Sequence, residues 1–123
     1  MFRLTITLFL LFVVMSCDDE SIKEVIGERD LSNDIVKLLA PTNNTVLTSG
    51  EITFNWERVN NAGFYQLQIV TPTFESTNQI ILDVTTSVTD TIKVLEANEY
   101  EWRIKAFNSI YETKYSTNSF TVE

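Results

Sequence analysis

Histidine is absent from this chain, and cysteine occurs once, at Cys17. Without histidine there is no Ser-His or Cys-His nucleophilic pair and no histidine metal site, and a lone cysteine forms no intramolecular disulfide. The three glycines are scattered, so the chain lacks a glycine-rich phosphate loop. These absences exclude most enzyme classes, and we predict no catalytic residue, no cofactor and no metal ligand.

Basic residues are also few. Nine Lys and Arg stand against 17 Asp and Glu, which gives a formal charge of −8, and the bases are scattered along the chain. Phosphate backbones are bound by clustered Lys and Arg. We therefore expect no nucleic-acid partner.

The first segment, Met1 to Ser16, has Arg3 as its only charge, followed by an apolar run. The run of roughly a dozen residues has the length of a secretory signal core, whereas a membrane span needs about 20 apolar residues. We predict a signal peptide over residues 1–16.

The signal segment ends in Val14-Met15-Ser16-Cys17, which resembles the lipobox of bacterial lipoproteins. The resemblance implies cleavage before Cys17 and lipidation of its thiol, with palmitate-type acyl chains anchoring the protein in a membrane. Several acyl chains hold a protein far more firmly than one. The alternative is an ordinary signal peptide with an incidental cysteine.

Residues 17–34 form a predicted acidic linker. Seven acids less two bases give a net charge of −5, and such a segment repels itself and stays extended. An acidic run after a lipidated cysteine also resembles the surface-export signal of Bacteroidota lipoproteins, which implies display at the outer-membrane surface. The alternative is a solvated linker without an address.

Short β-rich runs with turn signals between them follow from Ile35 to the end, which is typical of a β-sandwich. In the clearest run, residues 99–107, charged and apolar residues alternate with period two, so Tyr100 and Trp102 share a dry face. We predict an all-β domain without helices. Its seven expected strands are 35–40, 51–57, one through Tyr65 to Ile69, 79–84, 88–95, 99–107 and 114–122.

The domain from 35 to 123 resembles the fibronectin type III pattern. The matching residues are Trp56, Ala62, Tyr65, Leu95, Tyr100, Trp102, Ile104, Ala106 and Asn108. The resemblance implies a seven-stranded antiparallel, immunoglobulin-like sandwich with Trp56, Tyr65, Tyr100 and Trp102 in its core. It also implies that the Tyr100 hydroxyl bonds back to the preceding loop, although the interval from Leu95 is a residue shorter than usual and lacks Pro-Gly.

In this topology two loops lie at one end of the sandwich and form the predicted partner-contact site: Arg58, Asn60, Asn61, Ile110 and Tyr111. Exposed aromatic and apolar residues at loop tips anchor interfaces and stack on sugars. The alternative is that Tyr111 packs over the end of the sandwich.

Other candidates are weaker. Phe74 is expected near the opposite end as a core residue, or else as a contact, and Glu99 with Glu101 are expected to be a solvated, charge-balanced face. Asp90-Thr91-Ile92 matches the short O-glycosylation motif of Bacteroidota, which makes Thr91 a candidate acceptor. Asn43 begins an N-glycosylation sequon, expected to be idle in a bacterium.

We therefore expect a non-enzymatic, lipid-anchored envelope protein that presents one fibronectin type III-like domain to a protein or glycan partner. One alternative is a structural or assembly lipoprotein facing the periplasm. Another is an accessory module of a glycan-uptake complex. The fold alone does not choose among these roles.

Overall fold

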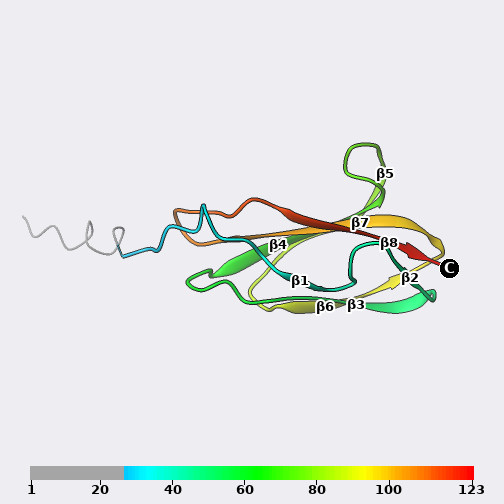
Figure 1. Cartoon of the computed structure of the whole chain (residues 1–123), viewed down its shortest axis with the longest axis horizontal. Coiled ribbons are helices and arrows are strands. Elements are labelled where there is room, and N and C mark those ends of the chain that lie inside the picture. The colour runs from blue at the N-terminus through cyan, green and yellow to red at the C-terminus, as the bar shows by residue number, and fades with distance from the viewer. Residues whose placement is uncertain (1–26) are drawn as a thin grey trace, which may run out of the picture.

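In a computed structural model, residues 27–123 of the chain are described (Figure 1). The predicted signal peptide, Cys17 with its lipidation, and the first part of the acidic linker lie outside the described residues. Within residues 27–123, no helix is long and apolar enough to cross a membrane.

Two β-sheets pack face to face to form the domain (Figure 1). The smaller sheet has the strand order β1-β3-β6, and the larger has the order β2-β8-β7-β4-β5. The strands are β1 (Leu38–Ala40), β2 (Thr45–Leu47), β3 (Gly50–Trp56), β4 (Phe64–Pro72), β5 (Thr77–Thr86), β6 (Asp90–Leu95), β7 (Asn98–Phe107) and β8 (Ser116–Val122). The all-β prediction is confirmed, and the described residues contain no helix.

The predicted count of seven strands is wrong, because residues 27–123 contain eight. The additional strand, β2, lies between the expected strands 35–40 and 51–57. After β1 the chain turns at Asn44, whose φ is 60°, and crosses to the larger sheet. There β2 pairs in parallel with the last strand, Thr45 opposite Phe120 and Leu47 opposite Val122. A three-residue strand with so distant a partner has almost no local signature.

Strand β7 is the centre of the larger sheet, because it pairs with β4 on one side and β8 on the other. Its apolar residues are buried as the alternation predicts: Tyr100, Trp102, Ile104 and Ala106 are at most 4% exposed. Its charged residues alternate with them on the outer face of the sheet.

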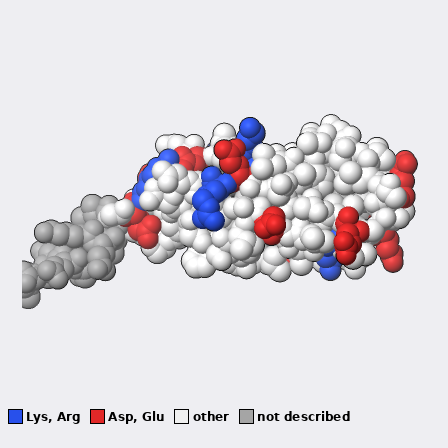
Figure 2. Space-filling view, turned by 90° about the horizontal axis from the view of Figure 1, so that it is seen from below, with Lys and Arg blue, Asp and Glu red and all other residues white. Residues whose placement is uncertain are grey.

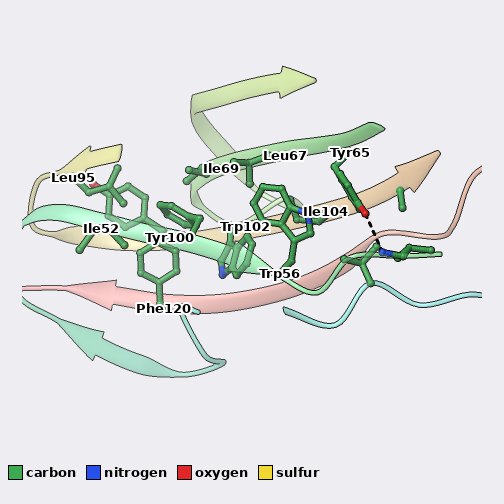
Figure 3. Packing of buried hydrophobic residues seen from close by; sticks show 14 of the residues in the cluster. Ile52, Trp56, Tyr65, Leu67, Ile69, Leu95, Tyr100, Trp102, Ile104 and Phe120 are labelled. Atoms are coloured by element: carbon green, nitrogen blue, oxygen red, sulfur yellow. Dashed lines mark hydrogen bonds between the residues drawn. The ribbon is translucent and has the colours of Figure 1, made fainter. Parts of the chain in front are cut away.

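Aromatic rings fill the space between the two sheets (Figure 3). The ring of Phe54 meets Trp102 and Phe120 edge-on, at centroid distances of 5.2 and 5.7 Å. Trp56 and Tyr65 form a third pair at 5.8 Å. Such contacts stabilise a pair beyond its area burial, by about 0.5–1.5 kcal/mol. The four predicted core aromatics are all buried.

Two tyrosine hydroxyls tie loops to this core. The Tyr100 hydroxyl donates to the carbonyl of Glu96 at 2.8 Å, so it does bond back to the preceding loop despite the shortened interval. The Tyr65 hydroxyl accepts a 2.9 Å hydrogen bond from the backbone N–H of Val59, and both residues are buried. The second bond fixes the loop that follows β3 (Figure 3).

The residues that pack into the core begin before Ile35, the expected first residue of the domain. Leu31 is fully buried in the core and Val36 is 1% exposed, whereas Ile35 between them is 80% exposed. Part of the segment that was predicted to be acidic linker therefore lies against the sandwich, because burying the Leu31 side chain is favourable.

Candidate functional site

The two loops of the predicted contact site do lie together. Gly63 N–H donates to the carbonyl of Phe107 at 3.0 Å, which joins the loop after β3 to the loop after β7. Within the second loop, the Asn108 carboxamide oxygen accepts from the backbone N–H groups of Ile110 and Tyr111 at 3.0 and 2.8 Å. This turn shapes the loop tip.

The same end of the sandwich also holds the chain's own N-terminal segment (Figure 1). Asn108 Nδ2 donates to the Arg29 carbonyl at 3.0 Å, and Arg29 Nη1 donates to the Asn60 carbonyl at 3.1 Å. Ser109 Oγ contacts Glu28 Oε1 at 2.6 Å. Several polar groups of the predicted contact loops are thus occupied by residues 28–29.

The side chains of this loop end differ in exposure. Tyr111 is half-buried and packs against the core, which is the alternative that the sequence left open. Ile110 is 46% exposed, and Arg58 is exposed beside a hollow of 280 Å³ that Asp34 and Asn60 also line. A partner contact at this end remains a prediction. Arg58 and Ile110 are exposed there, and so are Asn60 and Asn61, whose hydrogen bonds within the described residues use their backbone carbonyls.

Phe74 lies near the opposite end, in the β4–β5 turn, but it is not a core residue. The turn brings its ring onto the outer face of the larger sheet, where its backbone N–H donates to Glu101 Oε1 at 2.7 Å. The Arg103 guanidinium carbon lies 4.0 Å from the centroid of the Phe74 ring. The expectation that Phe74 plugs the core is therefore wrong, because Glu101 and Arg103 hold it outside.

Arg103 is the centre of a stack on this outer face. Its guanidinium lies between two rings, with Tyr115 on the other side at 4.2 Å, and its Nε donates to Gln68 Oε1 at 2.7 Å. Next along the sheet, Lys105 lies 5.2 Å from the Tyr115 ring and pairs with Glu112 at 2.9 Å. The hydrogen bond to Glu112 raises the pKa of Lys105.

Amide and carboxylate groups continue this polar surface toward the sheet edge. Gln66 and Gln68 donate to the two oxygens of Asp83 at 3.0 and 3.2 Å, and the Tyr115 hydroxyl donates to Gln66 at 3.1 Å. We call the residues Gln66, Gln68, Phe74, Asp83, Arg103 and Tyr115 the outer-face cluster. The sequence places Arg103 outward by alternation, but gives no sign that Phe74 and Tyr115 would enclose it.

The candidate glycosylation residues lie elsewhere. Thr91 is partly buried on β6, directly opposite Phe54 on the inner side of the smaller sheet. Asn43 is exposed, and its side-chain oxygen accepts a 2.8 Å hydrogen bond from Ser119 N–H. Glu101 also accepts from the Ser119 hydroxyl at 3.1 Å, whereas Glu99 is exposed. Among residues 27–123, no three acids or cysteines cluster as a metal site would require.

Comparison with known proteins identifies the fold. No protein-family model and no curated protein matches the chain. Fibronectin(III)-like modules of Clostridium thermocellum CbhA align with 72% of this chain and 96% of theirs, with a TM-score of 0.54 and 12% identity. An engineered protein of known crystal structure aligns over the same share, with a TM-score of 0.56 and 11% identity, and the match spans 20% of its length. The chain therefore has a fibronectin type III-like fold.

Proposed function

We propose that this protein is a non-enzymatic, lipid-anchored cell-envelope protein that displays one fibronectin type III-like interaction domain at the outer-membrane surface. Cys17 carries the lipid, residues 18–26 and the packed N-terminal segment form the tether, and the domain binds a protein or glycan partner. A domain of this fold builds its binding surfaces from loops and sheet faces on a rigid sandwich. An accessory module of a glycan-uptake complex is the alternative role at the same surface.

The position of the N-terminal segment carries the proposal. The segment is tied to the loops after β3 and β7 by Arg29 and Asn108, at one end of the long axis (Figure 1). Nine residues separate Cys17 from Gly27, and a fully extended chain spans the ten steps between them in at most about 35 Å. A lipid on Cys17 would therefore keep the loop end toward the membrane and leave the opposite end and both sheet faces available.

The surface of the domain supports an interaction role. The smaller sheet runs along the lower side of Figure 1, and this side faces the viewer in Figure 2, where uncharged atoms cover most of the area. Strand β6 contributes Ile92 and Val94 to the exposed surface, at 61% and 65% exposure. Exposed apolar side chains on an otherwise acidic protein favour contact with a partner.

The test of anchoring compares the wild-type chain with Cys17→Ser in the native host. We expect the wild type to be processed and to fractionate with the outer membrane, and Cys17→Ser to lose both properties. A variant that is still processed at the same site and still membrane-bound would contradict lipidation.

The test of surface display is protease treatment of intact cells, with a periplasmic protein as the leakage control. Cleavage of the domain with an intact control supports outward display. Because a compact sandwich can resist protease, antibody labelling of intact cells accompanies the experiment. Protection in both assays until the outer membrane is broken favours the alternative, a structural or assembly lipoprotein that faces the periplasm.

A further inference from the structure

We propose that a pocket beside Arg103, on the outer face of the larger sheet, binds a carboxylate that carries a small apolar group. The pocket lies under the β4–β5 turn, away from the loop end that the sequence favoured. The proposal concerns the ligand of a particular site, and it holds whether or not the chain is lipid-anchored.

The pocket has the size and the walls for one small group. Its volume is 180 Å³, which corresponds to about six water molecules at ~30 Å³ each. Cofactor and drug sites are larger, at about 300–1,000 Å³. The lining residues are Gln68, Val70, Phe74, Thr77, Ile80 and Arg103. Three of these six side chains are apolar, and a single guanidinium provides the charge.

The guanidinium of Arg103 is held in a fixed orientation. The Phe74 and Tyr115 rings enclose it at 4.0 and 4.2 Å, and Gln68 accepts from Nε at 2.7 Å. Within residues 27–123 this is the only hydrogen bond of the Arg103 side chain, so both terminal nitrogens retain their donors. Two adjacent guanidinium donors match the two oxygens of a carboxylate.

Arg103 also lacks an anionic partner in the described part of the chain, although the protein is acidic. The ion pairs of residues 27–123 are Arg29 with Asp34 and Lys105 with Glu112. The two nearby acids already have neutral partners: Asp83 accepts from Gln66 and Gln68, and Glu101 accepts from Phe74 N–H and the Ser119 hydroxyl. A guanidinium that has free donors and no anion beside it is available to an anionic ligand.

The surroundings favour one kind of anion. Asp83 and Glu101 lie on the strands around Arg103, and their charges oppose a dianion such as phosphate. Val70 and Ile80 are a directly opposed pair on β4 and β5, and they form an apolar wall of the pocket. A monoanionic carboxylate with a short aliphatic group satisfies both the guanidinium and this wall.

The binding experiment uses the full-length chain in non-ionic detergent, with isocaproate as the probe and isocaproamide as its uncharged counterpart. Calorimetric titration is corrected with protein-free detergent. We expect isocaproate to bind in a saturable manner and isocaproamide to bind about tenfold more weakly or not at all, because charge-assisted hydrogen bonds are the stronger ones. Equal binding of acid and amide, or no binding of isocaproate, overturns the proposal.

Two matched pairs of variants locate the site. Arg103→Gln is compared with Arg58→Gln, an exposed arginine at the loop end. Ile80→Glu is compared with Val94→Glu, and these residues have similar exposure, 63% and 65%, on different sheets. We expect the first member of each pair to lose isocaproate binding by about tenfold or more, and the second to retain it.

Each variant pair has an outcome that overturns the site. Binding retained by a folded Arg103→Gln, or lost equally in Arg58→Gln, shows that Arg103 does not hold the probe. Binding retained by Ile80→Glu, or lost equally in Val94→Glu, shows that the probe binds elsewhere or responds only to net charge. The pair of glutamate variants also covers the case in which Arg103→Gln fails to fold, since both replace exposed side chains. Melting curves establish the folding of each variant before titration.

The source of the carboxylate is decided by a second set of probes. A short peptide that ends in leucine is titrated with a free and with an amidated C-terminus. Tighter binding of the free-ended peptide than of isocaproate supports the site and identifies the end of a polypeptide as the ligand. Binding of isocaproate alone supports the site and identifies a free organic acid.

Discussion

Removal of the Tyr65 hydroxyl tests how much one buried hydrogen bond, to the loop after β3, contributes to the stability of the domain. In the wild type this hydroxyl accepts the backbone N–H of Val59 at 2.9 Å, with Tyr65 0% and Val59 7% exposed. Tyr65→Phe leaves the ring in place beside Trp56 and removes only the acceptor. The amide of Val59 then has no partner and is shielded from water.

The expected cost follows from this burial. Leaving a buried donor without a partner costs about 1–3 kcal/mol. A domain of this size loses about 4–8 °C of Tm per kcal/mol, so a loss of about 2 kcal/mol corresponds to ~8–16 °C. Because domains are stabilised by about 5–15 kcal/mol in total, we expect the variant to remain folded.

The measurement is urea unfolding followed by tryptophan fluorescence, with Tyr100→Phe as the matched control. Tyr100→Phe also removes one hydroxyl, but its partner is the carbonyl of Glu96, an exposed residue that water can solvate. We expect Tyr65→Phe to lower the unfolding midpoint more than Tyr100→Phe, with unchanged m-values. An equal or smaller effect of Tyr65→Phe would refute the reasoning.

Three further predictions concern other parts of the molecule. Trp102→Phe should destabilise the domain by about 1 kcal/mol more than Trp56→Phe. The indole N–H of Trp102 donates to the Pro41 carbonyl at 3.1 Å, whereas that of Trp56 has no partner among residues 27–123. Equal unfolding midpoints of the two variants would contradict this. Asn108→Ala should increase hydrogen exchange over residues 28–34 and 108–111, and Asn108→Asp should increase it mainly over 28–34, because Asp keeps the acceptor for the loop amides but loses the donor to the N-terminal segment. Identical exchange in both variants would argue against this division. Burial raises the pKa of Tyr100, so the unfolded chain releases this proton first as the pH rises. The stabilisation is therefore fully present below pH ~10, the ordinary value for tyrosine, and is lost as the pH rises through the folded pKa. Urea unfolding between pH 8 and 12 should show a shallower alkaline fall for Tyr100→Phe, and a fall as steep as in the wild type would show that Tyr100 is not its source.

Much of the fold could be predicted because one face of each long strand is dry. In β7 and β3 the apolar residues recur at every second position, and this period survives whatever the partner strands are. Strand β2 could not be predicted, since it pairs with β8, which is more than 70 residues away in the sequence. Leu31 was assigned to the linker because it is a single apolar residue among acidic neighbours. Its burial depends on contacts with the rest of the sandwich, which the local sequence does not show.

The candidate sites show the same division. Loop residues such as Asn61 and Asn108 were predicted to lie together, and they do, because their strands are neighbours in the expected topology. That the N-terminal segment would occupy the same end depends on where the chain enters the sheet. The contact is made by hydrogen bonds of Arg29 and Asn108, residues far apart in the sequence. No local sequence pattern predicts such a contact.

The sequence by itself determined the alternation that sets the two faces of β7, and with it the burial of Trp102 and the outward position of Arg103. It also carries the lipobox-like segment, which needs no fold to be recognised. Only the tertiary structure decided that Phe74, from a turn, and Tyr115, from the segment before β8, would enclose Arg103. The physical reason is that strand alternation is a local property of the backbone, whereas a stack of three side chains requires the sheet to bring distant segments within contact distance.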